Sequence, residues 1–256
     1  MDTRPRQQTL TLIAIALTFG SGAADVASFT RLGGVFTSVM TGNIVLWGLA
    51  AARGSLSLAS HTAVSIAGYI AGVAGGAWIA HGTRVPPAVK GTVAEADADA
   101  GSASAGDQGA ALPGSVLRVL LAQLTLVTGF TVGWEVSGAA PAGWAQFCLL
   151  ATLAAAMGLQ SFAVNNMGLT EVSTTYLTGT LTGLVSSLAS PGQSTRHGLR
   201  RFGVLIGLVA GASLCGLFVA TAADGVPALP LAAVITTVVA ATRLRRGEMS
   251  PRGVSM

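Results

Sequence analysis

Hydroxyl and amide side chains stand in the middle of two stretches that are otherwise apolar enough to lie in a membrane. VFTSVMTGNIVLWG occupies residues 35–48, and VSTTYLTGTLTGLVSS occupies residues 172–187. An unsatisfied polar group in hydrocarbon is costly, so we expect these side chains to face protein or a water-filled cavity that binds a small polar or ionic solute. The candidate binding residues in the two stretches are Thr37, Thr41, Gly42, Asn43, Thr174, Thr178, Gly179 and Thr180.

Spacing on a helix would place the threonines of each stretch on one face. Thr37 and Thr41 are four residues apart, and the second stretch repeats this spacing, so each forms a polar stripe. Asn43 lies off the stripe on a continuous helix. A helix break at Gly42 would free backbone amides and carbonyls and bring Asn43 toward the same cavity. Alternatively, the hydroxyls bond to the carbonyl four residues earlier and only pack or bend the helix.

Asp25 is the only acid placed within the interior of an apolar run, and a carboxylate inside a membrane indicates function by default. It could bind a cation, pair with Arg31 or carry a proton. The alternative is a residue at the membrane interface that reaches headgroups or caps the next helix. Gln160 holds the corresponding place in the second half of the chain. An uncharged amide there would make any coupling to ions or protons asymmetric.

The composition indicates a polytopic helical membrane protein. Hydrophobic residues make up 51% of the 256 residues and charged residues only 9%, which excludes an ordinary soluble domain. We predict an all-α membrane helix bundle, a single domain over residues 1–256, in which the Pro-, Gly-, Ala- and Asp-rich residues 82–115 form a disordered loop. The runs that approach the roughly 20 residues needed to span a bilayer are 10–29, 34–52, 62–81, 116–136, 144–166, 171–190, 202–222 and 226–242.

Internal duplication is the strongest organisational signal. Placing Thr41-Gly42 on Thr178-Gly179 aligns the two polar stretches, and a two-residue slip then aligns two rows of glycines at intervals of four. Because lipid supplies no hydrophobic force between helices, such rows permit the close contact that holds helices together; alternatively, glycine is simply common here. The predicted packing residues are Gly68, Gly72, Gly76, Gly203, Gly207 and Gly211. The predicted homologous halves are 10–81 and 144–222, with further spans at 116–136 and 226–242.

The number of spans decides how the halves are related. If 34–52 and 171–190 both cross the membrane, there are eight spans, the repeats are parallel, and ten basic residues lie inside against four outside. If both are re-entrant, six spans remain, the repeats are inverted, and the count is twelve against two. Segment length favours eight spans, whereas a Thr-Gly tip midway suits a re-entrant hairpin. Both arrangements place the N- and C-termini in the cytoplasm.

Three stretches give the chain a resemblance to a known family. GAADVASFTRLGGVFTSVMTGNIVLWGLA (22–50), AAAMGLQSFAVNN (154–166) and TTYLTGTLTGL (174–184) resemble the YoaK-like bacterial membrane proteins, a family of unknown function. The resemblance covers almost the whole chain outside 82–115 and implies a multi-pass protein of the bacterial inner membrane without an assigned substrate. The chain departs from the family pattern at Ser161, where an Asn is expected. The positions that match by motif are Gly22, Asp25, Ser28, Phe29, Gly34, Phe36, Met40, Thr41, Gly42, Asn43, Gly158, Gln160, Thr174, Thr175, Thr178, Gly179 and Thr180.

No signature of an enzyme, a metal site or a cofactor is present: the sequence lacks paired carboxylates, a His and Cys cluster at zinc spacing and a phosphate loop. The net charge of +4 comes from cations in connections and tails, which favours contact with a lipid bilayer and not with nucleic acid. We therefore predict a secondary transporter or permease for a small polar or ionic solute, with a mid-membrane site formed by two Thr-Gly helices. The alternative is a non-transporting scaffold or assembly subunit that binds partner helices. A homo-oligomer remains open.

Overall fold

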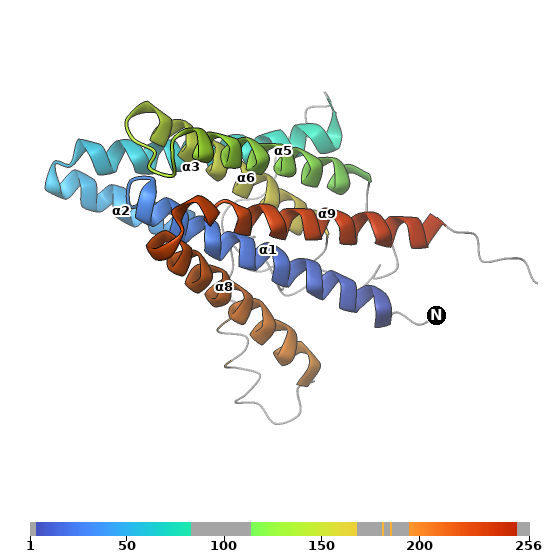
Figure 1. The fold of residues 1–256 in the computed structure, drawn as a ribbon. Helices are drawn as coiled ribbons and strands as arrows, with labels where there is room; N and C mark the ends of the chain where they lie inside the picture. Colours follow the sequence, from blue (N-terminus) through green and yellow to red (C-terminus); the bar gives the residue numbers. More distant parts are fainter. Residues whose placement is uncertain (1–3, 83–113, 168–180, 182–184, 186–194, 250–256) are drawn as a thin grey trace, which may run out of the picture.

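The computed structural model describes residues 4–82, 114–167, 181, 185 and 195–249, and this part of the chain is helical without a β-strand (Figure 1). The all-α class predicted from the sequence is confirmed. The elements are α1 Arg4–Arg31, α2 Met40–Arg53, α3 Leu56–His81, α5 Gly114–Val136, α6 Trp144–Asn166, α8 Thr195–Thr221, the short 3-10 helix η3 Ala223–Gly225, and α9 Ala228–Met249.

Six of the described helices, α1, α3, α5, α6, α8 and α9, have the length and apolar composition needed to cross a bilayer. α2 does not, because its 14 residues extend only about 21 Å at 1.5 Å per residue. The predicted span at 34–52 is therefore not found, since the helix there begins only at Met40. The predicted span at 171–190 lies outside the described residues except for Leu181 and Val185, and the predicted disordered loop lies outside them from residue 83 to 113.

The spanning helices run between two ends of the bundle. At one end, the start of α6 meets the end of α1, because Gln146 Nε2 donates to the Arg31 carbonyl at 2.8 Å. Gln146 Oε1 also lies 3.1 Å from Nε2 of His61 near the start of α3, and Arg31 donates to the Val219 carbonyl near the end of α8 at 3.2 Å. We call this the α2 end, and the opposite end, where α1 begins and α9 finishes, the terminal end (Figure 1). α1, α5 and α8 run toward the α2 end, and α3, α6 and α9 run away from it.

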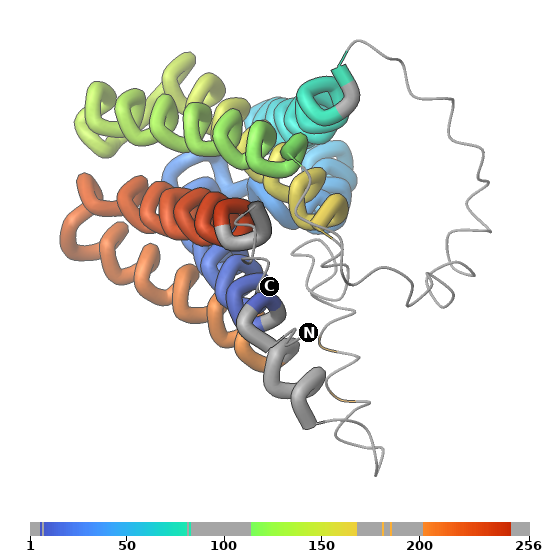
Figure 2. Tube along the Cα trace, turned by 90° about the vertical axis from the view of Figure 1, so that its right-hand side faces the viewer, coloured from blue at the N-terminus to red at the C-terminus, as the bar shows by residue number. Residues whose placement is uncertain are grey.

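The six helices pack as two groups of three (Figure 2). The α1 group contains α1, α8 and α9, and the α6 group contains α6, α3 and α5. α1 and α6 are the central helices of their groups and the most buried of the six. Contacts between α5 and α9 and between α1 and α6 join the two groups. Helices far apart in the sequence therefore make the most extensive contacts, α1 with α8 and α3 with α6.

Glycines allow these two most extensive contacts, which we call the α1–α8 seam and the α3–α6 seam. In the α3–α6 seam, a Cβ on Gly72 would overlap the carbonyl oxygen of Ala155, and a Cβ on Gly158 would overlap that of Tyr69. The other predicted packing glycines also face the seams: Gly68 lies against Ala151, Gly76 against Phe162, Gly203 and Gly207 against Ile15, and Gly211 against Phe19. Such contact brings backbones close enough for van der Waals attraction to hold helices together in lipid.

Candidate functional site

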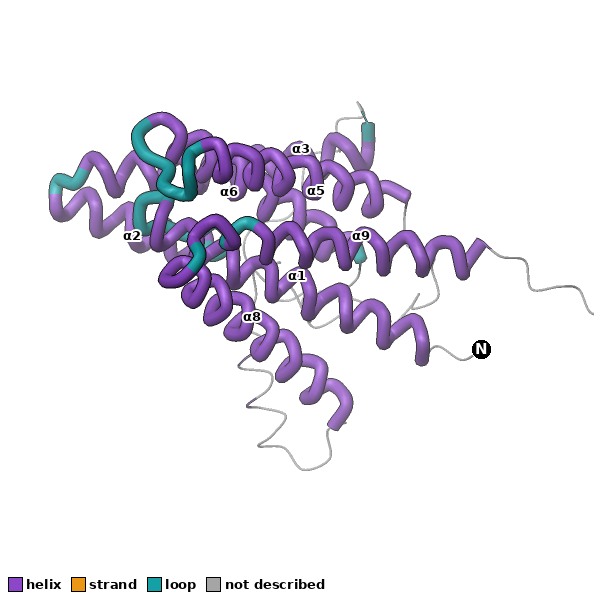
Figure 3. Tube along the Cα trace, in the orientation of Figure 1, coloured by secondary structure: helices purple, strands orange, loops and turns teal. Residues whose placement is uncertain are grey.

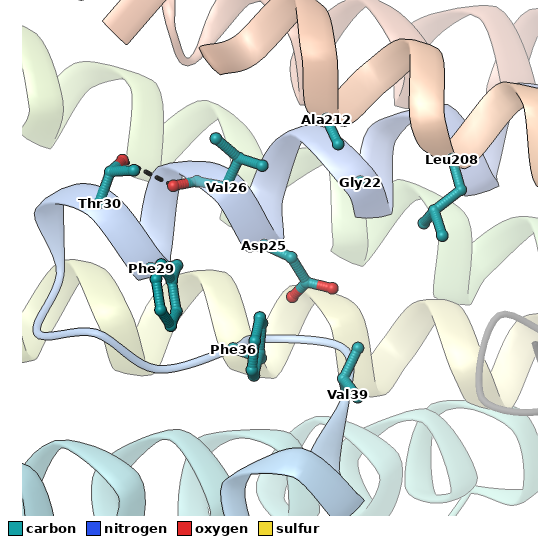
Figure 4. A pocket seen from close by; sticks show the side chains of 9 residues that line it. All are labelled: Gly22, Asp25, Val26, Phe29, Thr30, Phe36, Val39, Leu208 and Ala212. Atoms are coloured by element: carbon teal, nitrogen blue, oxygen red, sulfur yellow. Dashed lines mark hydrogen bonds between the residues drawn. The ribbon is translucent and has the colours of Figure 1, made fainter. Parts of the chain in front are cut away.

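A non-helical segment, residues 32–39, builds the candidate site, and we call it the arm. α1 ends before Gly33 and Gly34, whose φ values of 99° and 75° lie in the left-handed region that favours glycine. Gly33 also lies against the His61 ring, which leaves no room for a Cβ. The arm then runs back beside α1 toward the interior of the bundle (Figure 4). α2 starts at Met40, where the arm ends.

α2 leads the chain back to the end from which the arm entered. Gly54, with a φ of 62°, ends α2, and its N–H bonds to the last carbonyls of the helix. Ser55 then caps α3 by accepting a hydrogen bond from the Leu58 N–H at 3.4 Å. In Figure 3, the arm and the turn between α2 and α3 are loops at the α2 end, where the α5–α6 and α8–α9 connections also lie. The polypeptide between α1 and α3 therefore enters and leaves the bundle at the same end.

The arm folds against the buried carboxylate of Asp25 on α1. Asp25 Oδ1 accepts hydrogen bonds from the backbone N–H groups of Thr37 and Ser38, both at 2.8 Å, and from Thr37 Oγ1 at 3.2 Å. Among the described residues, Asp25 Oδ2 accepts only from Ser38 Oγ, at 2.6 Å. Backbone amides that donate to a carboxylate form strong, charge-assisted hydrogen bonds. Both carboxylate oxygens thus hold the arm, and Oδ2, which accepts a single hydrogen bond, keeps a lone pair for a ligand or a proton.

Asn43, in the first turn of α2, clamps the arm from the other side. Its Oδ1 accepts from the Phe36 N–H at 2.9 Å, and its Nδ2 donates to the Phe36 carbonyl at 2.6 Å and to Ser65 Oγ at 3.1 Å. A primary amide carries both a donor and an acceptor, so Asn43 satisfies both backbone groups of one arm residue. Asn43 is fully buried. It therefore positions the arm.

A pocket of about 310 Å³ lies beside Asp25, between α1, the arm and α8 (Figure 4). Asp25 and Thr30 are the only lining residues with polar side chains, and Thr30 Oγ1 donates to the Val26 carbonyl at 2.6 Å. Two phenyl rings, Phe29 from α1 and Phe36 from the arm, stack at the rim with centroids 5.3 Å apart. The pocket is therefore an apolar chamber with one carboxylate in its wall.

The structure separates residues that the sequence grouped together. Thr37 is buried in the arm, whereas Thr41 is exposed on α2, and a Cβ added at Gly42 would lie 3.3 Å from the Phe36 ring. The predicted stripe of Thr37 and Thr41 is wrong because the two residues do not share a helix, and the break precedes Met40 instead of falling at Gly42. The remaining predicted binding residues, Thr174, Thr178, Gly179 and Thr180, lie outside the described residues.

Gln160 belongs to a second buried polar cluster. Its Oε1 accepts from Gln123 Nε2 in α5 at 2.8 Å, and its Nε2 donates to Ser21 Oγ in α1 at 2.8 Å. Gln123 Oε1 is buried and has no hydrogen-bond partner in the part of the chain that the structure describes. This cluster links the α6 group to α1 and stands one turn before Asp25 along α1. It contains no charge, and among the described residues it makes no hydrogen bond with Asp25 or the arm.

Three residues that hydrogen-bond to the predicted site residues were not themselves predicted. They differ in how far the sequence could have identified them. Gln123 is a lone amide within the apolar run 116–136, and a polar side chain at such a place is expected to bond across helices. Ser38 becomes significant only when the arm is known to bend at Thr37 and Ser38, because two consecutive amides can then share one acceptor. Ser65 is one of many small residues on α3 and carries no signal that would identify it.

Comparison with known proteins gives one family match and one similar protein. Residues 13–242 match the family model described as "Protein of unknown function (DUF1275)". The chain is 28% identical over 182 residues to the UPF0700 transmembrane protein YoaK of Bacillus subtilis (strain 168), an alignment that covers 70% of this chain and 67% of that protein. No solved structure matches the chain.

Proposed function

Since the chain belongs to the DUF1275 family of membrane proteins of unknown function, we propose from its geometry that it is a secondary transporter with its coupling site at Asp25 and the arm. The YoaK-like resemblance is confirmed by the same match. The observation that carries the proposal is an unwound segment whose amides bind a carboxylate inside a six-helix bundle. Non-helical backbone at membrane depth is tolerated where it is buried or lines a cavity, and transporters place their binding sites there.

In this proposal, the two halves form an inverted repeat of three spans each. α1, α3 and α5 correspond to α6, α8 and α9, which run in the opposite directions. The helix contacts support this correspondence between the two halves, since α1 packs on α8 and α9 just as α6 packs on α3 and α5. Gly22 and Gly158 also take equivalent places, each with its Cα pressed against a backbone carbonyl of the partner helix. By this register Asp25 corresponds to Ser161, three residues after the glycine, and not to Gln160.

The arm and α2 form a re-entrant segment in the proposed topology. The tip of the arm reaches Asp25, two turns inside α1. Of the arginines that the structure describes, only Arg31 and Arg53 belong to the α2 end, and the others lie toward the terminal end. Cations favour the cytoplasmic side, so the terminal end and both termini face the cytoplasm of a bacterial cell, and the arm enters from the opposite face of the inner membrane.

Coupling uses the lone pair on Asp25 Oδ2. With Oδ2 unoccupied, the ionised carboxylate holds the arm through the amides of Thr37 and Ser38. A proton or a cation at Oδ2 neutralises the carboxylate and weakens its charge-assisted hydrogen bonds, which loosens the arm from α1. Gly33 and Gly34 supply the backbone freedom for the arm to move. Occupancy of the site thus controls which face of the membrane it opens to.

Thiol accessibility tests this transport cycle without knowledge of the solute. Cys148 and Cys215 are first replaced by serine and alanine, and Val39→Cys then places one thiol on the arm at the pocket. In right-side-out and in inverted vesicles, a membrane-impermeant methanethiosulfonate should modify the Val39→Cys protein from both faces. Ile70→Cys is the control, because Ile70 is 60% exposed on the outside of α3 and should lie in lipid. Modification of Val39→Cys from one face only, or from neither, contradicts a transporter.

A further inference from the structure

The walls of the pocket beside Asp25 restrict the ligand that it could accept. Seven of the nine lining residues offer no polar side chain, and the Thr30 hydroxyl is already bonded to the Val26 carbonyl. A sugar or another polyhydroxylated solute would leave most of its hydroxyl groups without partners against these walls, at a cost for each group. The ligand must therefore concentrate its polarity at one point and be apolar elsewhere. A volume of about 310 Å³ is at the small end of the range for ligand sites, so the ligand must also be small.

The charge of the pocket determines the sign of the ligand. The donors that Asp25 meets among the described residues are backbone amides and hydroxyls of Thr37 and Ser38, and all are neutral. The nearby Arg31 instead donates to the Val219 carbonyl. A buried carboxylate without a cationic partner attracts a cation and repels an anion.

A bare metal cation fits poorly because the site offers too few oxygens. Hard cations take about six or more oxygen ligands, whereas the only carboxylate of the lining is that of Asp25, whose Oδ1 already accepts three hydrogen bonds and whose Oδ2 accepts one. An ammonium group needs only one or two acceptors and keeps an organic body that apolar walls can bury. The rings of Phe29 and Phe36 add an aromatic rim, which favours a cation further.

We propose that this pocket binds a small organic monocation, a protonated amine whose ammonium group bonds to Asp25 Oδ2 and whose apolar body lies against Phe29 and Phe36. The proposal names the substrate class for the transporter proposed above and so rests on that function. The same ammonium group would neutralise Asp25, so that substrate binding itself loosens the arm. Entry of the substrate and movement of the arm are then one event.

Direct binding to the purified full-length chain tests the assignment. Phenethylamine, protonated at neutral pH, is compared by equilibrium dialysis with phenethyl alcohol, which is neutral, and with 3-phenylpropionate, which is an anion. We expect saturable binding of the amine, with the alcohol and the anion at least tenfold weaker. Asp25→Asn preserves the shape of the side chain and should reduce amine binding at least tenfold. The amine that remains with this variant also reports how much the detergent itself takes up. Equal binding of amine and alcohol, or unchanged binding by Asp25→Asn, overturns the proposal.

Two further variants keep the test decisive if Asp25→Asn does not fold. Val39→Trp fills the pocket from the arm while Asp25 is kept and should abolish amine binding, whereas Phe29→Ala, at a side chain that is 48% exposed, should weaken it several-fold. Unchanged binding in both overturns the assignment. If no amine binds while the Val39→Cys thiol reacts from both faces, the ligand class fails and the transporter stands. If the amine binds while that thiol reacts from one face only, the pocket stands and the transport cycle fails.

Discussion

The α1–α8 seam and the α3–α6 seam use the same packing and carry different chemistry. In both, a glycine of a central helix and a glycine of its partner press against backbone carbonyls: Gly22 and Gly211 in the first, Gly158 and Gly72 in the second. Three residues after the central glycine, however, α1 carries an acid and α6 carries a hydroxyl, Ser161. The pocket beside Asp25 has α8 as one wall. Close packing is therefore a property of both seams, whereas the acid three residues after the central glycine, Asp25, is found only on α1.

This difference teaches that the contacts which hold the bundle together and the groups which bind a ligand are separable. Glycines set the distance between helices, since only the missing Cβ allows the backbones to touch. Asp25 acts on the arm, which packs on α1 beside the seam. Substitutions in the glycines should thus damage the two seams alike, and substitutions around Asp25 should affect only one.

The largest effect is expected from bulk placed in either seam. Gly72→Leu and Gly211→Leu each force a side chain into a backbone carbonyl of the partner helix, of Ala155 and of Phe19. Overpacking of a well-packed interior costs about 1 to 3 kcal/mol when side chains can adjust, and a backbone clash costs more. We expect neither variant to yield a monodisperse peak in fluorescence-detected size-exclusion chromatography.

Gly75→Leu provides the matched control for the seams, because a Cβ at Gly75 meets no atom within 4 Å. This variant should elute as the wild type does. If the Gly72→Leu and Gly75→Leu proteins behave alike, the close contact at the α3–α6 seam does not hold the helices together. If only one of the two seams tolerates leucine, the packing of the seams is not equivalent.

The next effect concerns Asp25, which has no charged counterpart at Ser161. Asp25→Ala leaves the buried amides of Thr37 and Ser38 without their acceptor, at about 1 to 3 kcal/mol for each unsatisfied donor. Asp25→Asn keeps an acceptor oxygen at the same place. We therefore expect a clear fall in thermal stability for Asp25→Ala and a much smaller one for Asp25→Asn, measured by thermal unfolding in detergent. Equal stability of the two variants would show that the carboxylate does not hold the arm.

A smaller loss is expected at the clamp on the arm. Asn43→Leu leaves the Phe36 N–H without its acceptor and removes one of the two donors to the Phe36 carbonyl, which should cost about 2 to 3 kcal/mol at a buried site. Ser65 still donates to the Phe36 carbonyl and limits the damage. Thr41→Val, an exposed position in the same turn of α2, should change stability by less than about 0.5 kcal/mol. If the Thr41→Val protein is as unstable as the Asn43→Leu protein, the hydrogen bonds of Asn43 are not what holds the arm.

The smallest effect belongs to the amide cluster, which carries no charge. Gln123→Leu leaves Gln160 Oε1 without its donor and should cost about 1 to 2 kcal/mol. Adding Gln160→Leu removes both partners, so the double variant should be less destabilised than the sum of the single variants. A double-mutant cycle on thermal unfolding measures this coupling. Strict additivity would mean that the hydrogen bond between Gln123 and Gln160 contributes nothing to the free energy of unfolding. Loss of amine binding in Gln123→Leu would show that the binding site includes this cluster.

Much of the architecture was predictable because its causes are local. A long apolar run favours a membrane helix, whose backbone hydrogen bonds are all made within the run, and the six spanning helices match six of the predicted runs. The glycine rows also lie at helix contacts as predicted, because a missing Cβ is the same on any neighbour. Asp25 was identifiable as a candidate because a carboxylate in an apolar run is costly without a purpose.

The sequence by itself determined an all-helical membrane protein of the DUF1275 family, with its tight helix contacts and its buried acid. Only the tertiary structure decided that residues 34–39 are non-helical and that Thr37 and Thr41 lie in different surroundings. Gly33 and Gly34 permit the turn that starts this segment, but the mostly apolar residues after them are equally compatible with a helix. The acceptor for its amides comes from Asp25, twelve and thirteen residues earlier on another element, and the clamp on Phe36 comes from Asn43 after the chain has turned. In this segment, hydrogen bonds to residues distant in the sequence take the place of helical hydrogen bonds. A pattern of neighbouring residues cannot predict such bonds.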